Sequence, residues 1–308
     1  MALDLRTPRL PVVVLAGGSS RRFGSDKLAA PIGGRSALAR VVASVSPLAS
    51  EVFLATAGPP SPKALGASLR RSVRVLRDRP RQWGAGPASA IAAALEGLGT
   101  EPTLFVPGDI PWVETAALRK FVARSTASDA DVAAPFWGSG ETEHLVQWHR
   151  SRRNLRFLPW RRPHALPARR ASEFLRAVPR TLLIPVRRLT DRPASFAHLT
   201  VPRDVHRPVA RGDLRGSTRC RVVAGPTKAS YRAAQAARSA GRPTAAAIAF
   251  ADESRRYARA GFSILAWHAL DDAMLIAGAV PELARSRRRL EEQFPVLSRR
   301  HETVNRSR

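Results

Sequence analysis

The stretch PVVVLAGGSSRRFGSDK, residues 11–27, decides the fold. Its β-branched opening is typical of a buried parallel strand, which runs directly into Gly17 and Gly18. Glycines let a backbone approach a ligand closely and present its N–H groups, which form an anion-binding concavity. Arg22 and Lys27 add positive charge beside the same loop. The segment predicts a cradle for a triphosphate whose leaving group is pyrophosphate. It is not a Walker loop, since the Gly-Lys-Ser/Thr ending is absent.

Short apolar strands alternate with helices through the first two-thirds of the chain. We expect strands at residues 51–57, 72–76, 102–106, 131–135 and 181–186, and helices at 36–45, 87–98 and 114–125. This order is typical of βαβ units and a mostly parallel α/β sheet, in which ligands bind beyond the carboxyl ends of the strands. Gly17, Gly18, Asp78 and Asp109 all fall at predicted strand ends.

A glycine- and arginine-rich stretch from about residue 208 to residue 226 has few apolar side chains and marks the predicted domain boundary. We expect a first domain at residues 1–208 and a C-terminal helical domain at 209–308. Prolines near helix starts and glycines at helix ends predict four helices, paired as short antiparallel hairpins. These helices span residues 227–240, 244–260, 262–277 and 281–294.

Tyr231, Phe250 and Trp267 lie on the alanine-rich helices of the predicted C-terminal domain. Two interpretations stay open. In one, the aromatic side chains form a surface for a partner protein or for self-association. In the other, they form the core of a self-contained helical domain.

Composition restricts the classes of function. The chain of 308 residues has one cysteine, Cys220, so an internal disulfide is impossible and a reducing, cytoplasmic setting is expected. No Cys/His cluster has zinc-ligand spacing, and no apolar run approaches the ~18 residues of a membrane-spanning helix, so we expect a soluble protein without a membrane partner. The net charge is +27. A nucleic-acid partner would explain it, but the absence of an aromatic-interleaved basic module favours an arginine-rich composition with an anionic small substrate.

The glycine-rich segment resembles the signature of the MobA-like NTP transferase family, Leu-Ala-Gly-Gly-x-Ser-x-Arg-Met-Gly-x-Asp-Lys. Nine positions match it, namely Leu15, Ala16, Gly17, Gly18, Ser20, Arg22, Gly24, Asp26 and Lys27. Only Phe23 departs, where the family usually has methionine. The resemblance spans roughly residues 9–207 and implies a Rossmann-like three-layer α/β/α nucleotidyltransferase domain.

Two further segments match the family in order. Asp78 precedes residues 86–91, where the family usually has Gly-Pro-Leu-Ala-Gly-Ile, so Asp78 is either a base-side residue or an ordinary loop acid. The segment PGDIP, residues 107–111, resembles Cys-Asp-Met-Pro, which implies that Asp109 holds Mg²⁺; otherwise Asp109 is a turn or N-cap residue. The resemblance implies nucleotide binding by Leu15, Ala16, Gly17, Gly18, Ser20, Lys27, Asp78 and Asp109, and catalysis by Arg22, Lys27 and Asp109.

The last matching segment departs more from the family. Residues 196–204, FAHLTVPRD, resemble Asn-x-Asn-Thr-Pro-Glu-Asp, with His198 and Thr200 where two asparagines near the metal and the acceptor are usual. The second metal ligand and the acceptor contacts therefore stay open. Residues 141–148 correspond either to the family's acceptor-facing strand or to a solvated loop.

The resemblance implies one reaction type, in which a terminal phosphate of an acceptor attacks the α-phosphorus of an NTP and pyrophosphate leaves. GTP as donor and molybdopterin as acceptor, a step of molybdenum cofactor biosynthesis, are the first expectation. Cytidylyl transfer to molybdopterin and transfer to a sugar or alditol phosphate use the same site. The rival is a catalytically impaired nucleotide-binding protein whose basic helical domain binds RNA or a protein partner.

Overall fold

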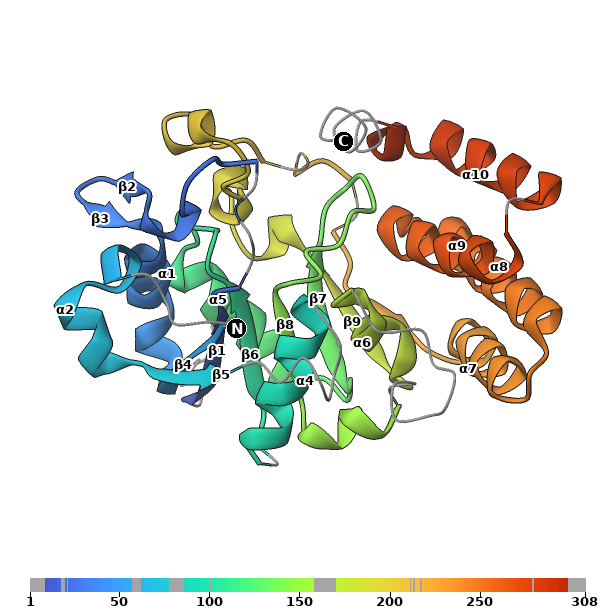
Figure 1. The fold of residues 1–308 in the computed structure, drawn as a ribbon, viewed down its shortest axis with the longest axis horizontal. Helices are drawn as coiled ribbons and strands as arrows, with labels where there is room; N and C mark the ends of the chain where they lie inside the picture. The colour runs from blue at the N-terminus through green and yellow to red at the C-terminus, as the bar shows by residue number, and fades with distance from the viewer. Residues whose placement is uncertain are drawn as a thin grey trace.

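The computed structural model describes residues 9–17, 20, 22–56, 62–77, 86–99, 101–157, 170–210, 212, 214–216, 218–278 and 280–298. Within them a central sheet carries helices on its faces, and four further helices follow towards the C-terminus (Figure 1).

In the described part of the chain the central sheet has eight strands, in the order β10-β9-β7-β8-β6-β1-β4-β5. The strands are β1 (Leu10–Leu15), β4 (Ala49–Thr56), β5 (Arg74–Arg77), β6 (Thr103–Pro107), β7 (Val132–Phe136), β8 (Gln147–His149), β9 (Thr181–Pro185) and β10 (Arg221–Val223). Strands β8 and β10 run antiparallel to their neighbours, and the other pairings are parallel. The mostly parallel sheet is as predicted. A small separate hairpin joins β2 (Pro31–Ile32) and β3 (Arg35–Ser36).

Helices cover both faces of the sheet, which explains the continuous apolar run of β1. Val12 and Val14 contribute to one core and Val13 and Leu15 to the other, because successive strand side chains point to opposite faces. The first core contains α1 (Ala37–Val45), α2 (Pro62–Ser72) and α5 (Thr115–Thr126); the second contains α4 (Pro87–Gly97) and α6 (Ser172–Ala177). This arrangement confirms the three-layer prediction. The strand expected at residues 72–76 begins later, at β5, because α2 continues to Ser72.

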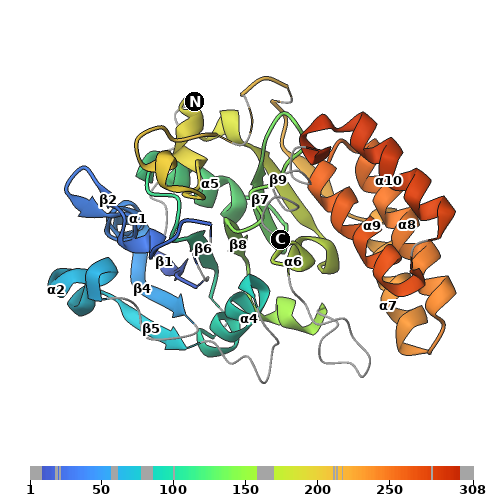
Figure 2. The same cartoon turned by 45° about the horizontal axis from the view of Figure 1, so that its top comes forward.

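Four helices lie side by side beside the β9–β10 edge of the sheet (Figure 2). They are α7 (Pro226–Ser239), α8 (Pro243–Arg259), α9 (Ser263–Ala277) and α10 (Pro281–Gln293), which confirms the four predicted helices. Proline stands in the first turn of α7, α8 and α10. Gly241 and Gly261, both at positive φ, end α7 and α8. After α7, Gly241 N–H donates to the Arg238 carbonyl and Arg242 N–H donates to the Ala237 carbonyl, a Schellman motif.

The predicted boundary region contains a strand of the main sheet. Strand β10 pairs with β9, with Val223 opposite Thr181. One apolar cluster also includes Phe174 of α6 together with Tyr231 and Phe250 of the C-terminal helices. The division into residues 1–208 and 209–308 stays a prediction, and in the described part the helices share a core with the sheet.

A buried charge cluster fastens these helices to α6. The fully buried Arg176 pairs with Glu253 (Nη2–Oε2, 2.7 Å), with Asp272 (Nη1–Oδ2, 2.6 Å) and with Glu173 (Nη1–Oε1, 3.1 Å). The Tyr231 hydroxyl donates to Glu173 at 2.9 Å. Burial raises the pKa of Glu173 to about 7. Removing the arginine would leave buried carboxylates without their positively charged partner. The cluster therefore makes the contact between α6 and the helices specific.

The aromatic side chains of the helices divide between the core and its rim. Tyr231 and Phe250 are buried, whereas Trp267 is half-buried with the Arg287 guanidinium 4.6 Å from its ring centroid. For Tyr231 and Phe250 the core interpretation is therefore the better one. No helix in the described ranges combines the length and apolar character that crossing a bilayer requires.

Candidate functional site

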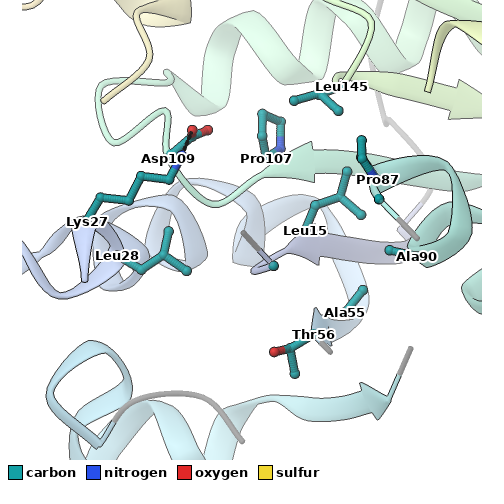
Figure 3. A pocket seen from close by; sticks show the side chains of 12 residues that line it. Leu15, Lys27, Leu28, Ala55, Thr56, Pro87, Ala90, Pro107, Asp109 and Leu145 are labelled. Atoms are coloured by element: carbon teal, nitrogen blue, oxygen red, sulfur yellow. Dashed lines mark hydrogen bonds and ion pairs between the residues drawn. The ribbon is translucent and has the colours of Figure 1, made fainter. Parts of the chain in front are cut away.

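Lys27 and Asp109, 82 residues apart in the sequence, meet where β1 and β6 end. Lys27 begins the short 3-10 helix η1 (Lys27–Ala29), which Asp26 caps by accepting the Leu28 N–H at 3.0 Å. Lys27 Nζ donates to Asp109 Oδ2 at 2.5 Å, and the two side chains are 21% and 14% exposed. The ion pair lies at one end of a cavity (Figure 3).

Gly108 sets how closely the ends of β1 and β6 approach each other. Its N–H donates to the Leu15 carbonyl at 3.0 Å. A Cβ at this position would lie 3.3 Å from that oxygen and 3.3 Å from Cδ2 of Leu28. The missing side chain lets the segment after β6 pass against the first loop, which brings Asp109 to Lys27.

The first loop turns back on itself to reach Lys27. Ser20 adopts φ +47, and its carbonyl accepts the N–H groups of Phe23 and Gly24 at 2.9 and 3.2 Å. The Lys27 N–H donates to Ser20 Oγ at 3.4 Å. Positive φ is uncommon for a residue with a side chain, so the backbone at Ser20 has an unusual conformation that produces the turn.

The remaining predicted residues of the loop differ in their relation to the cavity. Leu15 and Gly17 line it, and the Ala16 N–H donates to the Ala55 carbonyl at 2.8 Å. Arg22 is exposed in the turn and does not belong to the cavity lining. Two predicted residues, Gly18 and Asp78, lie outside the described residues.

The cavity has a volume of about 310 Å³. Its lining consists of Leu15, Gly17, Lys27, Leu28, Ala55, Thr56, Gly86, Pro87, Ala90, Pro107, Asp109 and Leu145. Lys27 and Asp109 stand at one end, and Pro87 and Ala90 at the other (Figure 3). The two charged side chains of the lining therefore stand together at one end, and the residues at the opposite end are apolar.

His198 bridges Asp109 and a second buried acid. Its Nδ1 lies 3.1 Å from Asp109 Oδ1, and its Nε2 lies 3.0 Å from Glu143 Oε2. The other oxygen of Glu143 accepts the indole N–H of Trp137 at 2.6 Å. Both ring nitrogens of His198 thus lie within hydrogen-bond distance of a carboxyl oxygen, which holds the ring between the two acids.

Sequence reasoning missed the role of this bridge. In the sequence, His198 stands out only as a replacement for a usual asparagine, and no pattern distinguishes Glu143. Thr200, two residues after His198 in the same motif, is exposed. The Thr200 N–H donates to Asp204 Oδ2 at 2.8 Å. The one local signal is a polar residue inside an apolar stretch, as His198 is in FAHL.

The charge of Asp109 is well determined by its neighbours. Burial by itself would raise the pKa of this carboxyl group, but His198 and then Lys27 oppose it with charge and hydrogen bonds. The pKa of Asp109 consequently lies well below its usual range. The carboxylate stays ionised and can pair with a cation of a ligand.

Asp109 is the acid through which the described part of the site could hold a metal. Within the described ranges, no group of three or more His, Cys, Asp or Glu side chains is arranged to hold a metal ion. Mg²⁺ is often bound by one or two carboxylates together with substrate phosphates and waters. Asp109 thus suits an ion that is delivered with a phosphate ligand.

Known proteins share this chain's sequence over part of its length. The chain is 32% identical over 122 residues to a molybdenum cofactor guanylyltransferase of Rhodobacter capsulatus, covering 39% of this chain and 60% of that protein. It is 36% identical over 141 residues to one of Acidiphilium cryptum, covering 44% and 65%. The chain thus spans about three-fifths to two-thirds of the length of these relatives.

The fold has a solved counterpart. The crystal structure of molybdopterin-guanine dinucleotide biosynthesis protein A from Archaeoglobus fulgidus matches with a TM-score of 0.51 at 21% identity, covering 64% of this chain and 96% of that one. The model of the MobA-like NTP transferase domain matches residues 12–181, which is more than half of the chain. Together with the glycine-rich loop after β1, this match shows that the chain belongs to the MobA-like NTP transferase family.

Proposed function

We propose that this chain transfers GMP from GTP to the terminal phosphate of molybdopterin and releases pyrophosphate. The observation that supports this most is the Lys27–Asp109 pair, which brings a cation and an ionised carboxylate from two loops to one end of a single cavity. The relatives named as molybdenum cofactor guanylyltransferases support this choice of donor and acceptor.

In this proposal the base and the phosphates occupy opposite ends of the cavity. Leu15, Pro87 and Ala90 provide apolar walls against which a flat base packs. Lys27 at the other end pairs with phosphate charge, and the backbone of Gly17 lies beside it. This division matches the distribution of charged side chains in the lining.

We propose three further contacts with the nucleotide on the basis of the family resemblance. Arg22, exposed beside the first loop, turns towards the pyrophosphate when nucleotide is bound. Gly18 adds a backbone donor, and Asp78 contacts the base.

Nucleotidyltransferases of this family generally use a divalent metal ion, and we propose Mg²⁺ held by Asp109. The support for this proposal is that the Asp109 carboxylate is ionised and lines the cavity, where a hard cation can meet its oxygens. When bound, Mg²⁺ neutralises negative charge on the phosphates. Lys27 then exchanges its partner Asp109 for phosphate oxygens, while His198 keeps its contact with the carboxylate.

The chemical step needs no side-chain base. An oxygen of the acceptor phosphate attacks the α-phosphorus, and a new P–O bond forms. The bond from the α-phosphorus to the bridging oxygen breaks, and its electron pair leaves with pyrophosphate. Lys27 stabilises the charge that develops on the leaving group. The acceptor phosphate is already anionic, so no proton has to be removed.

Pyrophosphate release tests the proposal. GTP, Mg²⁺ and molybdopterin together should yield pyrophosphate with the wild-type chain, and Asp109→Asn should lower turnover at least about 100-fold because the carboxylate charge is lost. Asp129→Asn is the control, since Asp129 is 70% exposed on the surface. Turnover with CTP, or with sugar phosphates, in place of GTP and molybdopterin would select the alternative activities. Nucleotide-dependent stabilisation without turnover on any phosphorylated acceptor would contradict the proposal and favour a binding protein.

A further inference from the structure

The connection between β7 and β8, residues 137–146, is called the Glu143 loop below. It carries two residues of the site, Glu143 and Leu145. Strands β7 and β8 pair at Val132 and Ala133, and the loop is tied to the end of β7 by a bridge between Phe136 and Thr142. The Glu143 N–H also donates to the Pro135 carbonyl of β7 at 2.9 Å, so the base of the loop is anchored on the sheet and its tip lies beyond these bonds.

The tip of the loop packs against the turn between α8 and α9. Gly140 closes the tip at φ +82, and its N–H donates to the Trp137 carbonyl at 2.9 Å. A Cβ on Gly140 would overlap the carbonyl oxygen of Gly261 and lie 3.0 Å from the Ser263 nitrogen. These atoms are backbone atoms, which yield less readily than the end of a flexible side chain. The loop and the turn are thus in direct backbone contact.

The turn between α8 and α9 is itself fixed. The Phe262 N–H donates to the Tyr257 carbonyl at 2.9 Å in a second Schellman motif. Arg221 Nη1 of β10 donates to the Ala260 carbonyl at 2.6 Å. The buried ring of Phe262 packs edge-on against Phe136 of β7, with ring centroids 5.4 Å apart. The turn can therefore serve as a support.

A second contact lies one residue from Glu143. The rings of His144 and His268 of α9 pack edge-on, with centroids 5.7 Å apart. His268 Nδ1 in turn lies 2.7 Å from Ser172 Oγ of α6. The C-terminal helices thus contact the Glu143 loop at its tip and beside its acid.

We propose that the α8–α9 turn braces the Glu143 loop and that Gly140 is a positioning residue for the reaction. The contacts run from the turn to Gly140, whose N–H donates to the Trp137 carbonyl, and from the Trp137 indole to Glu143. They continue through His198 to Asp109. Displacing the loop tip withdraws Glu143 from His198, which releases His198 from its fixed place on Asp109. The inference rests on the proposed function, and it gives the C-terminal helices a part in catalysis without contact with substrate.

Gly140→Ala tests the brace, with Gly241→Ala as its matched control. Gly241 also has a positive φ, +68, but a Cβ there would meet nothing within 4 Å. Both variants carry backbone strain, and only the first pushes the loop from the turn. We expect Gly140→Ala to lower kcat about 10- to 100-fold with a smaller change in KM for GTP, and Gly241→Ala to leave both within about twofold. Equal losses in the two variants would overturn the inference.

Hydrogen exchange of the amides of residues 141–143 gives a readout that needs no turnover. Gly140→Ala should speed this exchange at least about tenfold, and Gly241→Ala should not. A wild-type chain without turnover removes the proposed function but leaves this comparison intact. Two results overturn the brace. One is a folded Gly140→Ala variant whose exchange is unchanged. The other, if the wild-type chain is active, is a variant with faster exchange and unchanged kcat.

If Gly140→Ala does not fold, His268 supplies the test. His268→Ala removes the ring that packs on His144, whereas His268→Phe keeps a ring in the same place. We expect kcat and amide protection to fall in His268→Ala and to recover in part in His268→Phe, which restores the ring but not the hydrogen bond to Ser172. Wild-type values in His268→Ala overturn the inference.

Discussion

His198 Nδ1 lies 3.1 Å from Asp109 Oδ1, so the acid proposed to meet the metal is held from behind by a buried histidine. The same ring reaches Glu143 through Nε2 at 3.0 Å. Lys27 approaches the other oxygen of Asp109 from the cavity side. Asp109 is therefore held on one oxygen by a buried histidine and on the other by a lysine that lines the cavity, and in the proposed reaction the phosphates of the nucleotide draw the lysine away.

His198→Ala removes the bridge between Asp109 and Glu143. Loss of the bridge should lower kcat about 10- to 100-fold, as for other groups that orient a metal ligand, with a smaller effect on KM for GTP. Steady-state kinetics measures both. His206→Ala is the control, because His206 is an exposed histidine outside the site. Equal effects of the two substitutions would show that His198 does not orient Asp109.

Arg176→Met removes the positive charge of the buried cluster. Removing the arginine leaves Glu253 and Asp272 buried without their shared partner, which should lower the free energy of unfolding by about 3–5 kcal/mol. Arg180→Met removes only the exposed pair with Asp129 and should cost at most about 1 kcal/mol. Urea denaturation measures both values. Similar losses in the two variants would contradict the structural role of the cluster.

Two buried groups make the stability of the chain depend on pH. Burial lowers the pKa of His149 from 6.5 to about 3, so the unfolded chain takes up this proton first as pH falls. Above pH 6.5 His149 is neutral in both the folded and the unfolded chain. As the pH falls from 6.5 towards 3, the free energy of unfolding decreases by about 1.4 kcal/mol per pH unit, because only the unfolded chain binds the proton. Burial raises the pKa of Glu173 from 4.5 to about 7, so the folded chain binds this proton before the unfolded chain does. Glu173 therefore increases the free energy of unfolding as the pH falls from about 7 to 4.5.

A comparison with His149→Phe isolates this contribution. The variant lacks the proton uptake of His149 and keeps Glu173. The free energy of unfolding of His149→Phe minus that of wild type should therefore be about 2 kcal/mol larger at pH 4.5 than at pH 6.5. Urea denaturation at several pH values measures the difference, and a difference independent of pH would contradict the assignment.

The local part of the fold could be read from the sequence. The β-branched run of β1, the glycine loop and the helix-ending Gly241 and Gly261 each act over a few residues, so propensity and spacing locate them. The pair of Lys27 and Asp109 followed from a parallel sheet, since the ends of its neighbouring strands β1 and β6 meet at one edge.

The parts that depend on distant contacts could not be predicted. Strand β8 has three residues and exists because it pairs between β6 and β7. Strand β10 falls in a stretch whose glycines and arginines indicate a linker. Glu143 and His198 are 55 residues apart, and Gly140 meets Gly261 across a still longer separation. No local pattern encodes these contacts.

We propose above all that the cavity binds an NTP with its phosphates at Lys27. Calorimetric titration of GTP with Mg²⁺ tests it most directly, using wild type, Lys27→Ala and, as a matched control, the exposed Lys120→Ala. Lys27→Ala should weaken GTP binding about 10- to 100-fold, because a contact between two charged groups is lost, and Lys120→Ala should stay within about twofold of wild type. Wild-type affinity for GTP in Lys27→Ala would contradict the account.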